Sequence, residues 1–298
     1  MRFSAIPKLH PKTLPMKPAT LPVVSRREFV RRSTLGGTGL ALGLAVSTQA
    51  AQGRKIPVGL ELYSVREQCA KDLPGVLAAV AKIGYKGVEF AGYHNRSAKE
   101  LRKMLDDNGL VACGTHTGYE TVLKDKLKET VEFNRTIGNN FLIVPWMEGK
   151  SRQDWLDKAK LFNEIADQIK ADGMWVGYHA HAHDFQKFDG DSAWDLFFGN
   201  TKPSVIMQLD TSNCCDGGAD PVAVLKKYPG RARSIHIKPS GGGPEAVIGE
   251  DKIDWKSVFA FCEGQGKTDW FVVEHETSKD PLDAVQRSFA ALKRLGKV

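Results

Sequence analysis

Trp175-Val-Gly-Tyr-His179-Ala-His181 is an apolar, strand-like segment that ends in residues of the kind that bind metal ions. Three later segments have the same form: Val205-Ile-Met-Gln-Leu-Asp210, Ala232-Arg-Ser-Ile-His236-Ile-Lys238 and Trp270-Phe-Val-Val-Glu274-His-Glu276. Helix-like stretches separate the four segments, and such alternation predicts a parallel sheet covered by helices. If the sheet closes into a barrel, the carboxyl ends of all four strands meet at one mouth.

The same alternation extends along the chain and gives eight strands. Amphipathic patterns with helical spacing lie between them, as at residues 73–83, 156–169 and 282–292. No linker rich in Pro, Gly or Ser divides this part, so we predict one domain. The predicted fold class is α/β, a single (β/α)8 TIM barrel over residues 51–298, and these 248 residues are a typical length for it. The predicted strands are 58–65, 87–92, 111–117, 140–146, 175–181, 204–210, 232–238 and 270–276.

Glycines mark the expected helix ends and the longest irregular segment. A residue in the left-handed conformation commonly ends a helix, and glycine adopts that conformation most easily. Residues 239–254, which contain Gly241-Gly242-Gly243, follow the seventh predicted strand, where a loop can cover the mouth. The helix-ending glycines are Gly84, Gly109, Gly138 and Gly173.

The first fifty residues form a different kind of segment. Ser25-Arg26-Arg27-Glu28-Phe29-Val30-Arg31 looks like a twin-arginine export motif, and an uncharged run rich in Leu, Gly and Ala follows at 33–48. Gln49-Ala50-Ala51 then offers small residues to a signal peptidase. The apolar run is shorter than the ~20 residues of a spanning helix. We therefore predict a cleavable twin-arginine signal peptide at residues 1–50, a periplasmic or exported protein, and no membrane span after cleavage; an uncleaved anchor is the alternative.

The positive charge of the chain is confined to this leader. Residues 1–50 hold eight of the 42 Lys and Arg residues and one of the 35 Asp and Glu residues. Residues 51–298 therefore carry 34 charges of each sign, and their formal net charge is zero. A nucleic-acid-binding domain normally keeps a positive field in its folded part. We therefore predict no nucleic-acid partner.

Four side chains at the ends of strands five to eight are the predicted metal ligands. Side chains alternate along a strand, so His179 and His181 share one face. In TIM barrels the functional residues lie at the carboxyl ends of the strands. Two imidazoles and two carboxylates make a mixed nitrogen and oxygen site for a divalent cation such as Mn, Co, Zn, Fe or Mg. The predicted ligands are His179, Asp210, His236 and Glu274.

Each ligand also has a simpler explanation when it is considered alone. A His at a strand end is usually a hydrogen-bonded structural residue, and Asp210 can cap the turn at Thr211-Ser212-Asn213. Glu274 can be half of an ion pair. The coincidence of four such residues on consecutive strand ends favours the metal site. His183 is left out because it lies beyond the strand end, and His275 because it faces away from Glu274.

Several short motifs resemble, in their order, those of one superfamily. From about residue 56 to the C-terminus, the chain resembles the xylose isomerase-like TIM barrels known as sugar phosphate isomerases/epimerases. The two histidines of the fifth strand are similar to the branch that contains inosose dehydratases and enzymes that process 3-keto-glycosides. The resemblance implies a divalent metal held by the four predicted ligands. The motifs are Gly177-Tyr178-His179-Ala180-His181, Gln208-Leu209-Asp210-Thr211, Gly218-Ala219-Asp220-Pro221, Tyr228-Pro229-Gly230-Arg231, His236-Ile237-Lys238 and Val273-Glu274.

Some positions depart from the patterns of that superfamily. Ala180 replaces the Asn or His that usually stands between the two histidines, and Glu61 stands where Gln is common in the first strand. Classical ketose 3-epimerases have Glu at the position of His179. These differences argue against transferring a substrate specificity, but they leave the four predicted ligands in place.

The resemblance and the predicted site together lead to a function. A metal ion that polarises a carbonyl stabilises the enediolate formed when the neighbouring carbon loses a proton. We predict an isomerase, epimerase or lyase that acts in this way on a sugar or keto-sugar. His181 is the first candidate for the base, with Glu89 and Glu276 as alternatives. Lys238 is a candidate to stabilise an oxyanion, or else the partner of Glu274 or Glu276 in an ion pair.

The predicted partner is a small sugar or keto-sugar bound at the mouth. Two other functions stay open: an endonuclease IV-like hydrolase on the same scaffold, and a non-catalytic periplasmic sugar-binding protein. Export argues against a phosphorylated cytoplasmic metabolite, and the neutral mature chain argues against DNA. Homo-oligomerisation stays open as well. The predicted substrate-binding residues are Glu61, Tyr63, His116, Trp146 and Asp184.

Overall fold

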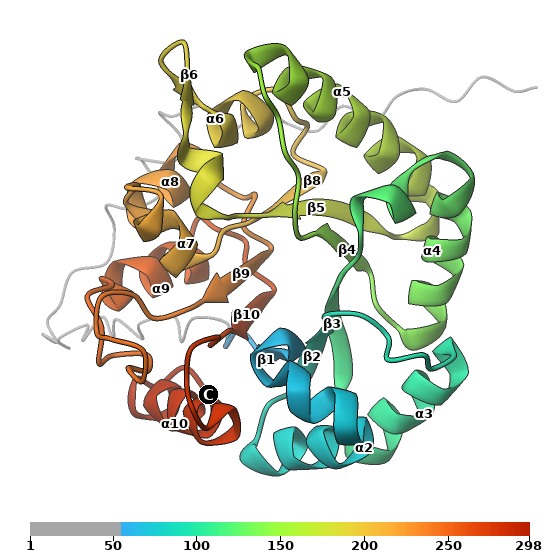
Figure 1. Ribbon diagram of the computed structural model, residues 1–298, viewed down its shortest axis with the longest axis vertical. Helices are drawn as coiled ribbons and strands as arrows, with labels where there is room; N and C mark the ends of the chain where they lie inside the picture. Colours follow the sequence, from blue (N-terminus) through green and yellow to red (C-terminus); the bar gives the residue numbers. More distant parts are fainter. Residues whose placement is uncertain (1–54) are drawn as a thin grey trace, which may run out of the picture. The chain divides into compact units, whose positions relative to one another are not determined.

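Eight parallel strands form the centre of the computed structural model, which describes residues 55–298 (Figure 1). The predicted signal peptide at residues 1–50 lies outside the described residues. Hydrogen-bonded neighbours follow the order β8-β5-β4-β3-β2-β1-β10-β9, so the first and last strands of the chain pair with each other. The strands are β1 Val58–Glu61, β2 Gly87–Phe90, β3 Val111–His116, β4 Phe141–Val144, β5 Trp175–His179, β8 Val205–Gln208, β9 Ser234–Ile237 and β10 Trp270–Val273.

The barrel closes between β8 and β9 through a small number of backbone contacts. A parallel bridge joins Asp210 to His236, and the amide of His236 donates to the carbonyl of Leu209 at 2.9 Å. The amide of Met207 donates to the carbonyl of Arg231 at 2.9 Å. The prediction of a single (β/α)8 TIM barrel is therefore confirmed.

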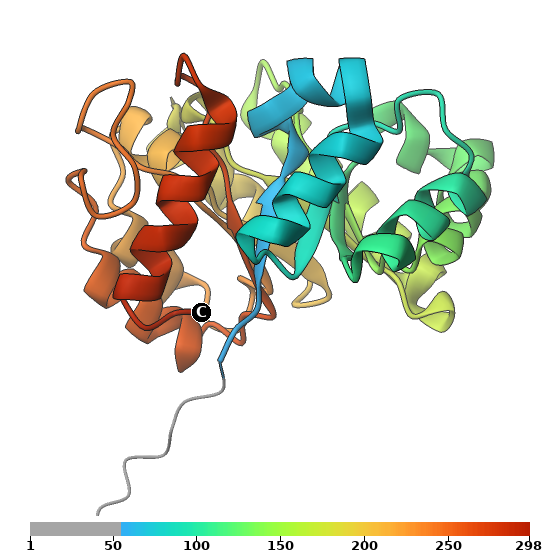
Figure 2. The same ribbon diagram turned by 90° about the horizontal axis from the view of Figure 1, so that it is seen from below.

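Helices surround the barrel of strands on its outside (Figures 1 and 2). Every residue of β1, β2, β4, β8 and β9 is buried, as expected for parallel strands between a packed interior and a layer of helices. Between β5 and α6 a short hairpin is formed by β6 Lys187–Phe188 and β7 Asp191–Ser192. The helices are α2 Arg66–Ile83, α3 Ala98–Asn108, α4 Lys124–Ile137, α5 Arg152–Ile169, α6 Ala193–Phe198, α7 Thr211–Asp216, α8 Pro221–Lys227, α9 Trp255–Glu263 and α10 Pro281–Arg294.

The first predicted strand is shorter than its composition suggests. Residues 62–65 continue as the 3-10 helix η1 Leu62–Val65, because the side chain of Glu61 accepts a hydrogen bond from the amide of Tyr63 at 3.0 Å and turns the chain. Helix α2 then bends at Asp72, whose φ of −151° is not helical. The carboxylate of Asp72 accepts from the amide of Gly75 at 3.0 Å, and Pro74 occupies the first turn of the second half, where proline is tolerated.

The glycines predicted to end helices have positive φ angles. Gly109, Gly138 and Gly173 adopt the left-handed conformation, with φ between 62° and 80°. Gly84 ends α2 at φ 122°, outside that region but in a range that glycine also adopts readily. Within residues 55–298, no helix combines the length and the apolar character that a membrane span requires.

The segment between β9 and α9 is irregular, as predicted, and it lies against the start of the C-terminal helix. The imidazole of His275 bonds the carbonyl of Ala246 at 3.0 Å, and Thr277 donates to the carbonyl of Pro244 at 2.8 Å. Arg287 of α10 donates to the carbonyl of Glu245 at 2.6 Å. These contacts fix the segment beside the β10–α10 connection, and none of its residues lines the cavity at the mouth.

Candidate metal centre

Polar side chains replace apolar ones in the barrel interior near the carboxyl ends of the strands. The four predicted ligands lie there together: one ligand atom from each is within 4.8 Å of every other. All four side chains are almost completely buried, although ionisable groups are rarely buried without a partner. Strands β5, β8, β9 and β10 each lead to one of them. They are His179, Asp210, His236 and Glu274.

Asp210 uses its two carboxylate oxygens differently. Its Oδ1 accepts from the amide of Asn213 at 2.7 Å and caps α7, so the capping role considered from the sequence is present. Its Oδ2 is buried and has no hydrogen-bond partner. Burial raises the pKa of Asp210 to about 7, since Lys238 only partly offsets the cost of a buried charge. A buried oxygen without a partner, facing other ligand-type atoms, fits a cation site.

His236 stands between two carboxylates. Its Nδ1 lies 2.5 Å from Oε2 of Glu274, and its Nε2 lies 2.5 Å from Oε2 of Glu89. Burial acts against the protonated ring, but hydrogen bonds to Glu274 and Glu89 raise the pKa of His236 well above its ordinary value. Because a metal ligand must offer a lone pair, a cation that binds this ring displaces a proton from it.

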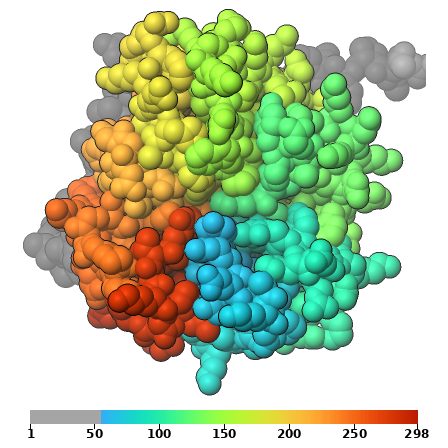
Figure 3. All heavy atoms as spheres, viewed as in Figure 1, coloured from blue at the N-terminus to red at the C-terminus, as the bar shows by residue number. Residues whose placement is uncertain are grey.

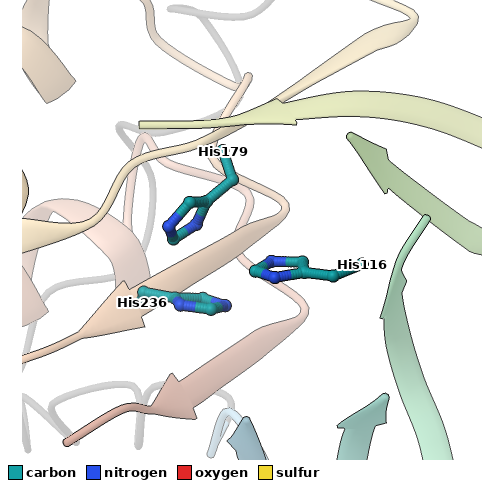
Figure 4. Close-up of side chains that lie close together, drawn as sticks. All are labelled: His116, His179 and His236. Carbon is teal, nitrogen blue, oxygen red and sulfur yellow. The ribbon is translucent and has the colours of Figure 1, made fainter. Parts of the chain in front are cut away.

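His179 and His116 lie beside His236, and their rings converge from three different strands (Figure 4). The ring centroids of His179 and His236 are 4.5 Å apart, and the rings of His116 and His236 are stacked at 5.2 Å. Burial lowers the pKa of both His179 and His116, so these two rings are neutral near pH 7. A neutral imidazole has one donor nitrogen and one lone pair.

The residues present therefore fit a divalent cation. Two imidazoles and two carboxylates supply the borderline ligands that Mn, Co, Zn or Fe prefer, and Mg also accepts the carboxylates. The two carboxylates balance the charge of a divalent ion, and all four ligand side chains are almost completely buried.

A second group of ligand-type residues adjoins the first and shares His236 with it. It contains Glu61, Glu89, His116 and His236, and the Oε2 atom of Glu61 has no partner there. A third group consists of the rings of His116, His179 and His236 and contains no carboxylate. A neutral imidazole offers one lone pair, so His236 can bind a cation in only one of the three groups. The oxygens of Glu89 already accept from Gln208 and His236. The four-residue group around Asp210 is therefore the better metal site.

Lys238 forms the ion pair that the sequence offered as its structural role. Its Nζ lies 2.6 Å from Oε1 of Glu276, 3.8 Å from Oε1 of Glu274 and 3.9 Å from Oδ2 of Asp210. Burial disfavours the ammonium group, but the carboxylates of Asp210, Glu274 and Glu276 raise the pKa of Lys238. A fixed positive charge thus stands at the rim of the candidate centre.

A cavity of about 410 Å³ opens over this centre, on the face shown in Figure 3. On that face the segment after β1 lies beside the segment after β10 (Figure 3). Four predicted catalytic or substrate-binding residues line the cavity with the ligands His179 and Glu274. These four are Tyr63, His116, His181 and Glu276.

His181 has the properties of a base. It lines the cavity next to His179, with the two ring centroids 4.9 Å apart, and its Nδ1 is buried without a partner. Burial lowers the pKa of His181 to about 4. The ring is therefore neutral near pH 7 and can accept a proton.

The other predicted residues lie outside the cavity lining, each for a visible reason. Asp184 is fully buried because its carboxylate accepts from the hydroxyl of Tyr178 and the amide of His181, both at 2.7 Å. Glu61 turns inward to cap η1, and Glu89 lies below the mouth with both oxygens hydrogen-bonded. Trp146 is 48% exposed at the rim, where its ring contacts those of His181 and His183.

Sequence reasoning gave no role to Gln208, which lies at the centre of the buried network. Strand alternation could have found it, because Gln208 and Asp210 are two residues apart and share a face. It also missed Ala91, Gly92 and Pro145, which line the cavity after β2 and β4. Small apolar residues carry no sequence signal of this kind.

A family model described as "Xylose isomerase-like TIM barrel" matches residues 77–295 of this chain. The chain belongs to the xylose isomerase-like TIM barrel family. This xylose isomerase-like chain is 24% identical over 271 residues to an inosose dehydratase of Clostridium tetani, covering 76% of this chain and 87% of the relative. It is 23% identical to the rhizopine catabolism protein MocC of Rhizobium meliloti, covering 76% and 78%.

A solved structure is also similar to this xylose isomerase-like barrel. The crystal structure of a sugar phosphate isomerase/epimerase from Parabacteroides distasonis superimposes with a TM-score of 0.72 at 26% sequence identity. The match covers 82% of this chain and 99% of the other.

Proposed function

We propose that this protein is a divalent-metal-dependent enzyme that removes a proton next to the carbonyl of a sugar or keto-sugar. The observation that carries the proposal is the convergence of two imidazoles and two carboxylates beneath a cavity lined by a neutral His181. A cation bound at these four residues would polarise the substrate carbonyl and so acidify the adjacent carbon. The similarity to inosose dehydratases and to a sugar phosphate isomerase/epimerase supports a substrate of this class.

His181 removes the proton in this proposal. The ring lines the cavity and is neutral near pH 7, so it can accept a proton; general base catalysis typically contributes about 10²–10⁴-fold to a rate. The same ring can return the proton to the neighbouring carbon, which gives isomerisation. Epimerisation requires a second group that returns a proton from the opposite face of the enediolate.

Glu276, which lines the cavity and pairs with Lys238, is the candidate acid. Burial and the neighbouring Glu274 raise the pKa of Glu276, whereas the ammonium group of Lys238, 2.6 Å from its Oε1, lowers it. If the proton lost by carbon passes to His181 and Glu276 protonates the leaving hydroxyl, the products are an enone and water. This elimination is the lyase outcome.

The alternative functions make different demands. An endonuclease of this fold needs a positive surface for DNA, whereas residues 51–298 have equal numbers of positive and negative charges. A sugar-binding protein without catalysis would bind sugar and exchange no carbon-bound proton.

Metal analysis followed by proton-exchange assays tests the proposal. The purified protein is expected to bind about one divalent ion per chain and to exchange a proton of an inosose, a 3-keto-glycoside or a ketose with deuterated water. Sugar binding with neither metal nor exchange would favour the non-catalytic alternative.

We also propose export through the twin-arginine route. Residues 1–55 fused to a reporter should direct export, and the double substitution Arg26→Lys/Arg27→Lys should stop it. Unchanged export of the double variant would contradict this proposal.

A further inference from the structure

Gln208 connects two neutral imidazoles through one oxygen atom. Its Oε1 lies 3.0 Å from Nδ1 of His179 and 2.9 Å from Nε2 of His116. An amide oxygen only accepts hydrogen bonds, so each ring must donate from the nitrogen that faces it. The lone pair of His179 is therefore on Nε2, and that of His116 is on Nδ1.

Glu89 determines which way the amide of Gln208 points. The Nε2 of Gln208 lies 3.0 Å from both oxygens of Glu89 and 3.0 Å from Oγ of Ser234. Rotation of the amide by half a turn would place its oxygen against a buried carboxylate, with two acceptors in contact and no proton between them. The position of Glu89 therefore selects one amide orientation, and with it the donor nitrogens of His179 and His116.

Glu89 acts on His236 in the same way. Its Oε2 lies 2.5 Å from Nε2 of His236, so that nitrogen keeps its proton, and Nδ1 faces Glu274 and the candidate centre. The strand β3 leaves room for this carboxylate at Gly114. A Cβ atom at that position would lie 2.0 Å from Oε1 of Glu89.

We propose that Glu89 and Gln208 are positioning residues that fix which nitrogen of His179 and of His236 can bind the metal. This inference rests on the proposed metal site and assigns Glu89 to the support of that site in place of proton transfer. Partners of this kind typically change metal affinity by about 10–100-fold when they are removed.

The substitution Glu89→Gln tests the proposal with almost no change of shape. The new amide cannot accept on both oxygens, so Gln208 is free to rotate and present its amino group to His179 and His116. Those rings then donate from the opposite nitrogens. We expect the affinity for Zn²⁺, measured by calorimetry on metal-stripped protein, to fall roughly 10–100-fold. We also expect the ¹⁵N spectra of His179 and His116 in metal-free protein to lose their single tautomers.

The exchanged pair Glu89→Gln/Gln208→Glu provides the rescue. A carboxylate at position 208 accepts from both His179 and His116, and an amide at position 89 can donate to it while accepting from His236. The double variant thus restores the direction of the hydrogen bonds with no change in net charge. We expect wild-type tautomers and a Zn²⁺ affinity within about threefold of wild type, since the partners are again present.

Ser234→Ala is the matched control, because it removes a bond to Gln208 but no partner of an imidazole. Its Zn²⁺ affinity and its ¹⁵N spectra should match those of the wild type. Wild-type affinity and tautomers in Glu89→Gln, or an exchanged pair that folds but binds no better than the single variant, would overturn the proposal. If the wild type binds no divalent ion, the proposed function fails, and the metal-free spectra still decide the positioning role.

Discussion

Each end of the barrel has a cavity, and the volumes of the two cavities do not show which end holds the ligand-type residues. At the amino ends of the strands lies a cavity of about 690 Å³, larger than the 410 Å³ cavity at the mouth. Residues at or just before the starts of the strands line it, including Trp175, Arg233 and Asp269. Among residues 55–298, the groups of metal-type ligands all lie at the other end.

Ionisable groups at the two ends are also satisfied differently. At the amino end, Arg233 stacks 4.0 Å from the ring centroid of Trp175 and pairs with Asp269 at 2.7 Å. At the mouth, Oδ2 of Asp210 is buried without a hydrogen bond, with the ammonium group of Lys238 3.9 Å away, and Nδ1 of His181 is buried without a hydrogen bond. Unsatisfied buried groups are costly, and at the mouth they belong to residues of the ligand type, as expected of a site that receives a ligand.

Asp210→Asn should produce the largest difference between the two ends. The amide can still cap α7, but it removes the charge at the candidate centre, so stoichiometric metal and activity should both be lost. Metal content by elemental analysis checks this. Asp220→Asn is the control, because Asp220 caps α8 through the amide of Val222 at 3.0 Å and lies outside the ligand groups. Full metal occupancy in Asp210→Asn would refute the ligand assignment.

His181→Gln should remove catalysis while leaving the metal in place. The base is lost but the four ligands remain, so solvent-deuterium exchange at the substrate carbon should fall by about 10²–10⁴-fold. His183→Gln is the control, because His183 bonds the carbonyl of Met147 and does not line the cavity. Normal exchange in His181→Gln would take His181 out of the base role.

Lys238→Met should affect stability in a way that depends on metal. Without the ammonium group, the carboxylates of Asp210 and Glu274 lose a buried counter-charge, and the metal-free protein should lose roughly 3–5 kcal/mol of unfolding free energy. Excess Mn²⁺ should restore most of this loss, since a ligand at about 1,000 times its Kd contributes about 4.1 kcal/mol. Thermal unfolding with and without the ion measures both values. The exposed Lys226→Met is the control, and equal losses in the two variants would contradict this account.

Arg233→Met, at the amino end, should have the smallest effect. It removes a partly exposed ion pair and a cation–π contact, which together are worth about 1–2 kcal/mol. Unfolding free energy should fall by that amount, while metal content and exchange rate stay at wild-type values. A loss of metal in this variant would show that the two ends are coupled.

The sequence was sufficient for those features that follow from local periodicity. Strand alternation placed His179, Asp210, His236 and Glu274 at carboxyl ends, and barrel closure then brought them together. The end of the first strand was not predictable in this way. Leu62–Val65 has a strand-like composition, but it forms a 3-10 helix that the side chain of Glu61 caps.

Several residues predicted to line the cavity lie outside it, because their hydrogen-bond partners are distant in the sequence or belong to local turns. The position of Asp184 just after the fifth strand predicts that it faces the mouth. Its carboxylate instead lies in the interior, where it accepts hydrogen bonds from the hydroxyl of Tyr178 and the amide of His181. Glu89 and Gln208 are 119 positions apart, and no sequence pattern in either strand predicts their contact. Orientation within a buried polar network is set by tertiary structure.

The two oxygens of the Asp210 carboxylate connect the cap of helix α7 to the candidate metal centre. One oxygen holds the amide of Asn213, and the side chain of Asn213 in turn holds the carbonyl of Ala180 on the strand-five side. A cation bound at Oδ2 would restrain the carboxylate and with it the cap, and loss of the cation would release both. Hydrogen exchange at the amide of Asn213 would then report whether a cation is bound at the centre, even in a sample without substrate and without turnover.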